Sequence, residues 1–533
     1  MSNKTRCLIV QSEFSAYSFW NYTDVCKLTG AKYPAAPLGL MTAAALLPQQ
    51  WQFKLLDANV EPVLDEHFEW ADIVCTGGML PQQKGMLSII DRAHQKGCPV
   101  VVGGPDPSSQ PELYQSADYL VLGEGEMSIP LFIRDLEKGS LSGAYISDVM
   151  TDMTKAVVPR FDLIRFKDYI HVGIQFTRGC PYNCEFCDII ELYGRKPRTK
   201  KPDQIINELQ TLYDLGYRGH IDFVDDNFIG NRRNVKKVLP AIKEWSEVHN
   251  YPFYFTTEAT INLADDEDLM QMMKDLDFRF VFIGIESPEN EVLKSVQKKS
   301  NLNRYISKNV MKIYSYGMVV NAGFILGFDN ESDQTAKNLV NCIQESGICM
   351  AMLGKLYALP NTQLARRLKA ENRLFEEDFL LSKDDTKIDQ TTSGLNFITE
   401  RPRLEILSDY LDILKYIYAP ERYYERIILT SLNLNSANKY KPGFFRMIKM
   451  AVVFSRVCIK VGFSRITGLL YWKMFVTVLL KNPRAIEAAI NLAAMFIHFQ
   501  KQSKYIIELT CKEINYIKSK GQVSYYNQKF IKN

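Results

Sequence analysis

Short apolar runs alternate with helical patterns in two successive series, and this alternation constrains the fold more than any other feature. The first series lies within residues 1–140. Strands that alternate with helices form parallel sheets, whose ligands bind at the carboxyl ends of the strands. The series therefore predicts a doubly wound, Rossmann-like α/β domain. Its expected strands are Cys7–Val10, Phe53–Asp57, Ile73–Thr76, Val100–Val102 and Tyr119–Leu122, and its expected helices are Gly39–Leu47, Lys84–Lys96 and Ser128–Lys138.

The second series lies within residues 166–370, after a segment, 141–165, that is expected to be a linker. Strand–helix units of about 30 residues predict a partial (βα)6 barrel with its chemistry at the carboxyl ends of the strands. Residues 371–533 have a helical pattern and are expected to form a C-terminal domain. The expected barrel strands are Gly173–Phe176, His220–Val224, Phe253–Thr257, Phe280–Ile285, Val319–Leu326 and Met350–Tyr357, and the helices are Pro202–Leu215, Asn234–Val248, Asp265–Leu276, Leu302–Tyr316 and Glu331–Ser346.

The composition of the 533-residue chain is that of a globular protein, with 46% apolar and 23% charged residues. A net charge of +3 is too small to indicate nucleic-acid binding. The start of the sequence has no long apolar run, so no secretory signal is expected. The 11 cysteines are scattered in the manner of reduced thiols. These features favour a cytoplasmic protein without a membrane span.

Three cysteines, Cys180, Cys184 and Cys187, follow the first expected barrel strand with C-x3-C-x2-C spacing. Three thiolates on one short loop can hold three corners of a [4Fe–4S] cluster, which leaves the fourth iron open to a small molecule. A structural zinc ion is the alternative, but zinc takes four protein ligands, and the next His or Cys after Cys187 is His220. The spacing therefore favours an iron–sulfur cluster.

This cysteine segment, Arg178–Asp188, resembles the radical S-adenosylmethionine (SAM) enzymes. The resemblance implies that SAM binds the open iron and that an electron from the cluster cleaves it to methionine and a 5′-deoxyadenosyl radical. It also implies a set of SAM-binding residues at strand ends, although an ordinary acidic loop, or ion pairs with Lys or Arg, would also explain the carboxylates. The implied residues are Phe186 before the third cysteine, Asp225, Asp226 and Asn227 after the second strand, Glu258 and Glu286 at the next two strand ends, and Gly323, Ile325 and Gly327 in the G-x-I-x-G-x-x-x-E run.

An α/β domain in front of such a barrel resembles the cobalamin-binding radical SAM enzymes. The sequence lacks the D-x-H-x-x-G motif that places a histidine below cobalt, so no histidine ligand is expected. Glycines after strands let a ligand approach the backbone, but they are also ordinary turn residues. The implied cobalamin contacts are Gly77, Gly78 and Met79 after the third strand, Gly103 and Gly104 after the fourth, and Gly123 and Glu124 after the fifth.

Closer resemblance, over roughly residues 1–430, is to the hopanoid C-2 methylase group and its uncharacterised relatives. The segments that carry it are Pro37–Leu40, Cys184–Ile190, Tyr193–Arg198 and Phe223–Gly230. The resemblance implies methylation of an unactivated carbon of an apolar metabolite or lipid, with one SAM to methylate cobalamin and a second to supply the radical. Two alternatives stay open. One is a cobalamin-dependent rearrangement, cyclisation or oxidation without methyl transfer, and the other is a methylthiotransferase, which needs further cluster cysteines and a C-terminal β-barrel.

Residues 427–486 contain Lys and Arg among large apolar residues, and no Asp or Glu. Helices of this composition lie on anionic bilayers, although a helical cap that packs on the barrel with a basic solvent face would have the same composition. We expect a small-molecule or lipid substrate and a reducing protein such as flavodoxin or ferredoxin. Nucleic acid is not expected, because no known binding module accompanies the charges. The expected location is the cytoplasm, with peripheral contact on the inner face of the membrane.

Overall fold

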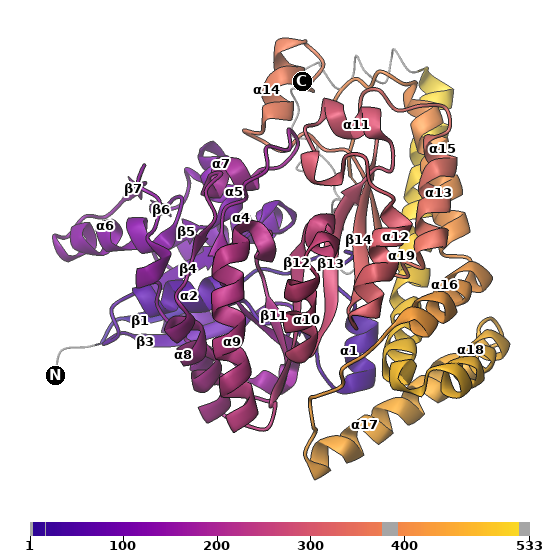
Figure 1. Cartoon of the computed structure of the whole chain (residues 1–533). Coiled ribbons are helices and arrows are strands. Elements are labelled where there is room, and N and C mark those ends of the chain that lie inside the picture. The colour runs from indigo at the N-terminus through magenta and orange to yellow at the C-terminus, as the bar shows by residue number, and fades with distance from the viewer. Residues whose placement is uncertain (1–3, 16, 376–392, 522–533) are drawn as a thin grey trace.

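The computed structural model of the chain describes residues 4–15, 17–375 and 393–521. It contains two parallel sheets and a set of long C-terminal helices, which together give the predicted α/β architecture (Figure 1). The first sheet lies toward the N-terminus, the second lies in the centre, and the C-terminal helices lie against the far side of the second (Figure 1). The fold class predicted from the sequence is confirmed.

The first sheet has six parallel strands in the order β3-β1-β4-β5-β6-β7. In β1, Cys7 and Ile9 belong to one core and Leu8 and Val10 to another, since successive side chains of a strand point to opposite faces. Helices therefore cover both faces, as a doubly wound domain requires. The strands are β1 (Arg6–Gln11), β3 (Gln52–Asp57), β4 (Ile73–Gly77), β5 (Val100–Gly103), β6 (Tyr119–Val121) and β7 (Gly143–Tyr145), and the helices are α2 (Leu38–Leu46), α3 (Asp65–Trp70), α4 (Gln83–Gln95), α5 (Pro105–Ser109) and α6 (Gly125–Glu137).

The second sheet has seven parallel strands in the order β15-β14-β13-β12-β11-β8-β2, and helices cover its outer face (Figure 1). Six of these strands are those expected for the partial barrel. They are β8 (Tyr169–Ile174), β11 (Gly219–Phe223), β12 (Phe253–Ala259), β13 (Phe278–Glu286), β14 (Val319–Leu326) and β15 (Ala351–Lys355), with helices α7 (Ile189–Tyr193), α8 (Pro202–Asp214), α9 (Arg232–Val248), α10 (Glu267–Asp275), α11 (Asn290–Ser295), α12 (Ile306–Ser315) and α13 (Thr335–Ser346). A short antiparallel ribbon of β9 (Thr177–Arg178) and β10 (Arg198–Thr199) follows β8.

Two three-residue strands were not expected, and both change the predicted boundaries. β7 lies inside 141–165, so part of the expected linker is the edge strand of the first sheet. β2 (Tyr33–Ala35) precedes most of the first sheet in sequence, yet it pairs with β8 of the second. The first 140 residues therefore contribute to both sheets.

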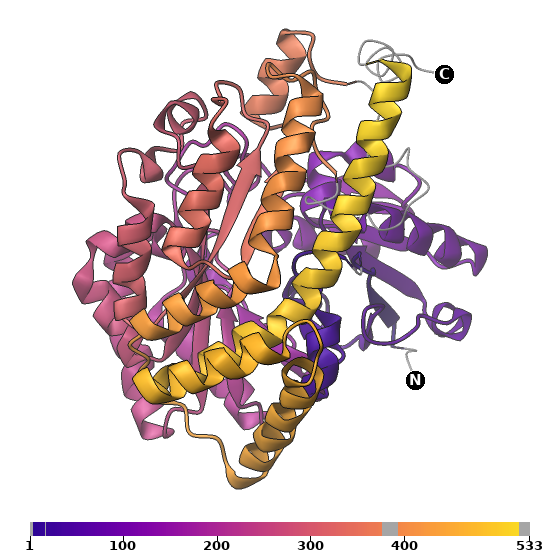
Figure 2. The same ribbon diagram turned by 90° about the vertical axis from the view of Figure 1, so that its right-hand side faces the viewer.

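The C-terminal region is helical, as predicted, and α19 (Ile486–Lys520) runs across the open side of the second sheet beside α1 (Thr23–Thr29) (Figure 2). Lys501 of α19 pairs with Asp24 of α1 at 2.5 Å, and the rings of Tyr17 and Tyr505 stack. No helix of the described part combines the length and apolarity that crossing a membrane requires. The other helices here are α14 (Gln363–Ala370), α15 (Arg403–Ile417), α16 (Pro420–Asn433), α17 (Phe444–Val457) and α18 (Gly468–Lys481).

A buried ion-pair network joins the first sheet to the cysteine loop. Arg178, two residues before Cys180, donates to Glu126 at 2.7 and 2.8 Å and to Glu124 at 3.3 Å. Arg198 donates to the other oxygen of Glu124 at 2.8 Å. Burial alone would raise the pKa of Glu126, but the hydrogen bonds and charge of Arg178 outweigh it and hold the pKa below its usual value. These ion pairs thus hold the two sheets in position, because separating them would leave buried charges without partners at a large cost in free energy.

Arg178→Met should therefore lower the free energy of unfolding by roughly 3–5 kcal/mol at neutral pH, because Glu126 stays buried without its cation. The loss should shrink as the pH falls below about 4.3, where the carboxyl group of the unfolded chain is itself protonated. Urea denaturation at pH values above and below about 4.3 measures this loss in the free energy of unfolding. Arg134→Met, at an exposed ion pair with Asp135, is the control and should change the free energy by less than about 1 kcal/mol. Equal effects of the two substitutions would contradict this account.

Candidate active site

The three cysteines lie on the loop that leads from the β9 strand to α7. The loop folds back on itself, since the Cys180 N–H donates to the Gly194 carbonyl at 3.2 Å. Gly179 has φ +87°, and a Cβ there would lie 2.8 Å from the Gly194 oxygen, so this approach requires glycine. All three thiols are free. Three thiols on one tight loop fit three corners of a [4Fe–4S] cluster.

The zinc alternative has no geometric support. Among the described residues, no three side chains of His, Cys, Asp or Glu gather closely enough to hold one metal ion. A structural zinc site needs four ligands around a single ion.

Glu286, expected at the SAM site, has a partner within the fold. Its carboxylate accepts a hydrogen bond from the Lys298 ammonium at 2.9 Å, and both groups are buried. The Lys298 ammonium lies 5.9 Å from the centre of the Phe186 ring. Burial raises the pKa of the Cys184 thiol, and the charge of Lys298 lowers it. Glu286 is thus one half of a buried ion pair that places a positive charge beside the cysteine loop.

Asp225 also points into the protein. It is fully buried and accepts hydrogen bonds from the backbone N–H groups of Phe176, at 3.0 Å, and Thr177. Burial raises the pKa of its carboxyl group well above the usual value. Asp225 therefore fixes the chain that leaves β8 toward the cysteines, and this role differs from the predicted contact with the SAM ammonium.

Asp226 lies at the main cavity and Asn227 lies beside the cysteine loop. Asp226 borders the main cavity of the protein, and burial together with repulsion from Asp188 raises the pKa of its carboxyl group to about 7. The Asn227 amide nitrogen lies 3.8 Å from the Cys180 sulfur. Its amide oxygen is buried and has no hydrogen-bond partner among the described residues. Both side chains remain available to a ligand at the cysteine loop.

Glu258 borders the same cavity from the carboxyl end of β12. Its carboxylate makes no hydrogen bond or ion pair within the described part of the chain. Burial, followed by repulsion from Asp222, raises the pKa of Glu258 to about 8. Glu258 is half-buried, and a carboxyl group that is partly withdrawn from water without a partner is costly, so this one is a candidate for ligand contact.

The glycine run on β14 supports the cysteine loop from the other side. The ring of Phe328, which follows Gly327, lies 5.6 Å from the ring of Phe186. Glu331 accepts the Gly327 N–H at 2.7 Å, and thereby fixes the end of the strand. Three predicted contacts, Gly323, Ile325 and Gly327, are not among the described residues that line the main cavity.

The loops after β4, β5 and β6 border the main cavity from the first sheet. Gly104 has φ +102°, and a Cβ there would lie 2.9 Å from the Gly78 nitrogen, so the two loops approach as only glycine allows. The cavity extends between the first sheet and its helices, where apolar side chains of α2 and α6, such as Leu46 and Phe132, line it. This cradle of backbone and apolar side chains fits a large cofactor that is held without a histidine. The predicted residues that line it are Gly77, Gly78, Met79, Gly103, Gly104, Gly123 and Glu124.

Glu124 lines this cavity, but its carboxylate is already engaged by Arg178 and Arg198. Glu124 therefore joins the two domains, and its contact with a cofactor stays a prediction. Arg198, in the segment that carries the resemblance to the methylase group, is the partner of Glu124. Within the described part of the chain, the side chain of Arg195 donates one hydrogen bond, to the Pro181 carbonyl at 3.5 Å.

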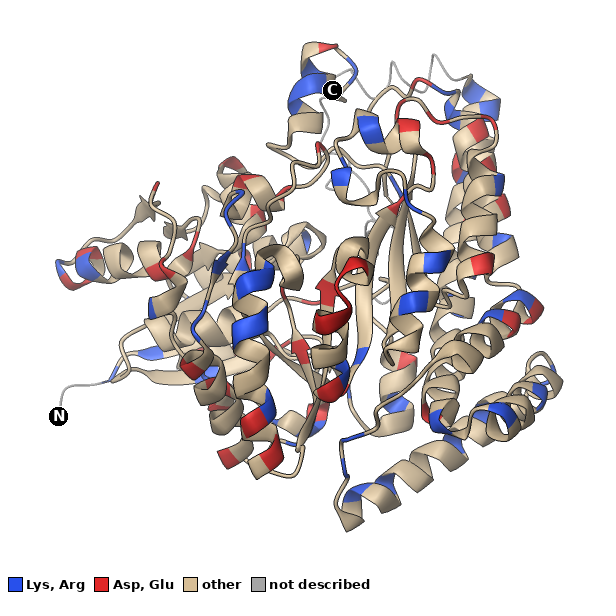
Figure 3. Ribbon diagram, in the orientation of Figure 1, with Lys and Arg blue, Asp and Glu red and all other residues tan. Residues whose placement is uncertain are grey.

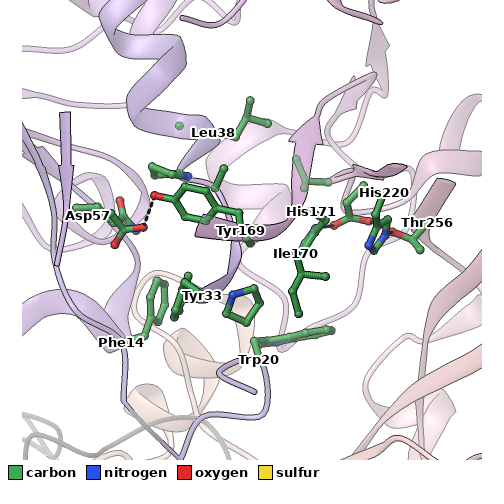
Figure 4. Close-up of a pocket in the computed structure, with 18 of the residues that line it drawn as sticks. Phe14, Trp20, Tyr33, Leu38, Asp57, Tyr169, Ile170, His171, His220 and Thr256 are labelled. Carbon is green, nitrogen blue, oxygen red and sulfur yellow. Dashed lines mark hydrogen bonds and ion pairs between the residues drawn. The ribbon is translucent and has the colours of Figure 1, made fainter. Parts of the chain in front are cut away.

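One continuous cavity of about 1770 Å³ joins the glycine loops, the end of the barrel near the cysteines and the interior of the second sheet. A polar group lies inside it. The rings of His171 and His220 stack 4.9 Å apart, and His220 Nε2 lies 2.8 Å from the Thr256 hydroxyl, which donates to Asp222. Figure 4 shows His171, His220 and Thr256 on one side of the pocket, with Tyr169 hydrogen-bonded to Asp57 on the other.

Sequence reasoning missed this polar group. His220 and Asp222 stand two positions apart on one strand, as do Thr256 and Glu258 on the next. Since residues two apart point to the same face, a polar pair within an apolar strand signals an interior face that is not filled by core packing. Two polar atoms facing the cavity, His171 Nδ1 and Asn321 Oδ1, are buried and have no hydrogen-bond partner among the described residues.

Three family models match the chain in the order of its parts. A B12 binding domain matches residues 28–132, and the Radical SAM superfamily matches residues 174–343. A domain of unknown function (DUF4070) matches residues 362–510. The two predicted cofactor-binding domains are confirmed.

Two relatives match most of the chain. An uncharacterized methyltransferase of Synechocystis sp. is 41% identical over 501 residues, which cover 93% of this chain and 91% of the relative. Hopanoid C-2 methylase of Rhodopseudomonas palustris is 36% identical over 394 residues, which cover 73% of this chain and 72% of the relative.

Two solved structures share the fold at 14% sequence identity. The cobalamin-dependent SAM radical enzyme OxsB has a TM-score of 0.59, with 97% of this chain and 81% of that one covered. The radical SAM methyltransferase TsrM from Kitasatospora setae, with cobalamin and a [4Fe–4S] cluster bound, has a TM-score of 0.60, with 85% and 99% covered. Together with the relatives, these matches show that the chain belongs to the radical SAM enzymes that carry a B12-binding domain, within the methyltransferase group that includes hopanoid C-2 methylase.

Proposed function

We propose that this enzyme methylates an unactivated carbon of an apolar, lipid-like small molecule. The observation that carries the proposal is the single cavity that joins the cysteine loop, the glycine loops and the interior of the second sheet. The cofactors of the family supply the chemistry: a [4Fe–4S] cluster with SAM provides a radical, and cobalamin provides a methyl group. Cys180, Cys184 and Cys187 would hold the cluster. A substrate in this cavity would lie between the two cofactors.

The interior of the cavity suits an apolar body with few polar groups. Trp20, Phe282, Met350 and Met352 line it. Such a lining excludes water, which protects a radical from side reactions. His171 Nδ1 lies 3.8 Å from a carboxylate oxygen of Asp222 but makes no hydrogen bond among the described residues, so it would accept or donate one hydrogen bond to a polar group of the substrate. The relative from Rhodopseudomonas palustris is named for hopanoid methylation, so polycyclic lipids are the first substrates to test.

The methylthiotransferase alternative loses support. The described C-terminal region is helical and contains no small β-barrel. Cys7 and Cys75 are buried side by side in strands, with 3.6 Å between their sulfurs, so they are not on loops that could hold a second cluster. Rearrangement or oxidation without methyl transfer stays as the second candidate, because it would use the same cavity.

We also propose that residues 427–486 contact an anionic membrane from the cytoplasmic side, and that flavodoxin or ferredoxin supplies the electron. The stretch contains no Asp or Glu (Figure 3). A helix surface rich in Lys, Arg and large apolar side chains binds anionic bilayers through both charge and apolar burial.

Methyl transfer is tested with SAM that carries a labelled methyl group, an anaerobically reconstituted enzyme and a bacterial lipid extract that contains hopanoids. The expected result is label in the lipid fraction, dependent on added cobalamin. Cys184→Ala is the control and should abolish both label transfer and 5′-deoxyadenosine formation, because the cluster loses a ligand. Formation of 5′-deoxyadenosine from lipid without any labelled lipid would favour the second candidate.

Membrane contact is tested by charge reversal at three exposed cations, with Lys460→Glu, Arg465→Glu and Lys473→Glu combined. At about 1 kcal/mol per basic residue, binding to phosphatidylglycerol vesicles should fall by about a hundredfold or more in sedimentation. Lys155→Glu, Lys237→Glu and Lys337→Glu, also exposed, change the net charge equally and should leave binding near that of the wild type. Equal losses in both triple variants would show that only net charge matters.

A further inference from the structure

Helix α17 is packed unlike the other long helices of the protein. Among its 14 residues, all of them described, Val457 is the single buried one. Large apolar side chains nevertheless occupy most of its positions, and Phe444 and Phe445 are 67% and 85% exposed. A helix that is apolar all round is stable when something covers it. The outer side of α17 therefore has the apolar composition of a surface that is in contact with a partner rather than with water.

The inner side of α17 forms a wall of the main cavity. Arg446, Met450, Val453 and Val457 line the cavity, and their spacing of three and four residues places them on one face of the helix. Ile448, Val452 and Ser455 lie on the opposite face and are exposed. One helix thus separates the cavity from the surroundings of the protein.

The cavity continues from α17 between two further helices. Val25 and Leu28 of α1 line it on one side, and Ile490 and Ala494 of α19 line it on the other. These side chains are apolar, so the passage from α17 to the interior of the second sheet can take a hydrocarbon. Phe445 both lines the cavity and is highly exposed, which indicates that the cavity reaches the surface at this helix.

The charge around α17 identifies what covers it. The helix and its successor α18 lie in a stretch with Lys and Arg but no Asp or Glu (Figure 3). Leu469 and Leu480 of α18 are 92% and 78% exposed. Exposed apolar side chains ringed by cations match the acyl chains and phosphate groups of an anionic bilayer. A water-filled surface would leave this apolar area uncovered.

We propose that α17 is a membrane-facing entrance, and that the lipid substrate passes from the bilayer beneath this helix, between α1 and α19, into the cavity. The inference rests on the proposed function. The inference adds to that function the source of the substrate, which is the anionic bilayer. It also adds the class of the substrate, which is an elongated apolar molecule. The far end of the passage is the polar group of His171, His220, Asp222 and Thr256, and beyond it Glu258 at the end near the cysteines.

Three variants of α17 test the route. Val453→Trp narrows the passage from its cavity face, whereas Val453→Ala widens it. Ser455→Trp places the same side chain on the exposed face of the same helix and is the matched control. The holoenzyme of each is incubated with vesicles of phosphatidylglycerol and phosphatidylcholine that carry a diazirine-labelled fatty acid. After irradiation, mass spectrometry locates the adducts.

The expected result is adducts on interior residues such as Phe282, Met350 and Met352 in the wild type and in Ser455→Trp. Val453→Trp should lose these interior adducts while it sediments with vesicles as the wild type does. Val453→Ala should gain them, and opposite changes in the two Val453 variants distinguish the width of the passage from misfolding, which would change labelling in the same direction in both. Interior labelling that is equal in all four proteins, or absent from the wild type, would overturn the entrance. Because labelling needs no SAM turnover, a failure of methyl transfer would contradict the proposed function and leave this result intact.

Discussion

The buried contacts between the two sheets are the constraint on which the rest of the structure depends. Each sheet alone has its ligand-binding edge at the carboxyl ends of its strands, and the cavity exists only because these edges meet. Arg178 and Arg198 reach across to Glu124 and Glu126, and Arg178 stands two residues before the first cysteine of the cluster loop. The same contacts therefore set the distance between the cobalamin cradle and the cluster. An enzyme that uses two cofactors on one substrate needs this distance fixed.

Much of the fold could be predicted because long strands and helices carry strong periodic signals. The eleven expected strands all appear, within a few residues of their expected bounds. β2 and β7 were not predicted, since their three residues, Tyr-Pro-Ala and Gly-Ala-Tyr, form no apolar run such as the one that marks the equally short β6. β2 in particular is held by pairing with β8, which no local pattern reveals.

Many residues of the candidate site were predicted, but the sequence did not show which of them hold the fold together and which face the cavity. Neighbouring carboxylates look alike in a sequence, yet Asp225 points inward to backbone amides while Asp226 faces the cavity. Glu286 pairs with Lys298, 12 residues further along the chain, and Glu124 pairs with Arg198, 74 residues further along. The cysteines needed no such context, because their spacing alone defines a three-cornered ligand set.

Helices α17 and α18 carry much exposed apolar surface, although no helix of the described part can cross a membrane, and the proposed membrane contact would cover this surface. Both cofactors of the family would lie at the edges of one cavity in a single chain. The most direct test is an anaerobic ultraviolet–visible spectrum of reconstituted protein after incubation with hydroxocobalamin and gel filtration. Cobalamin binding at the glycine loops predicts retained corrin absorbance beside the broad iron–sulfur band. An iron–sulfur band without retained corrin would contradict it.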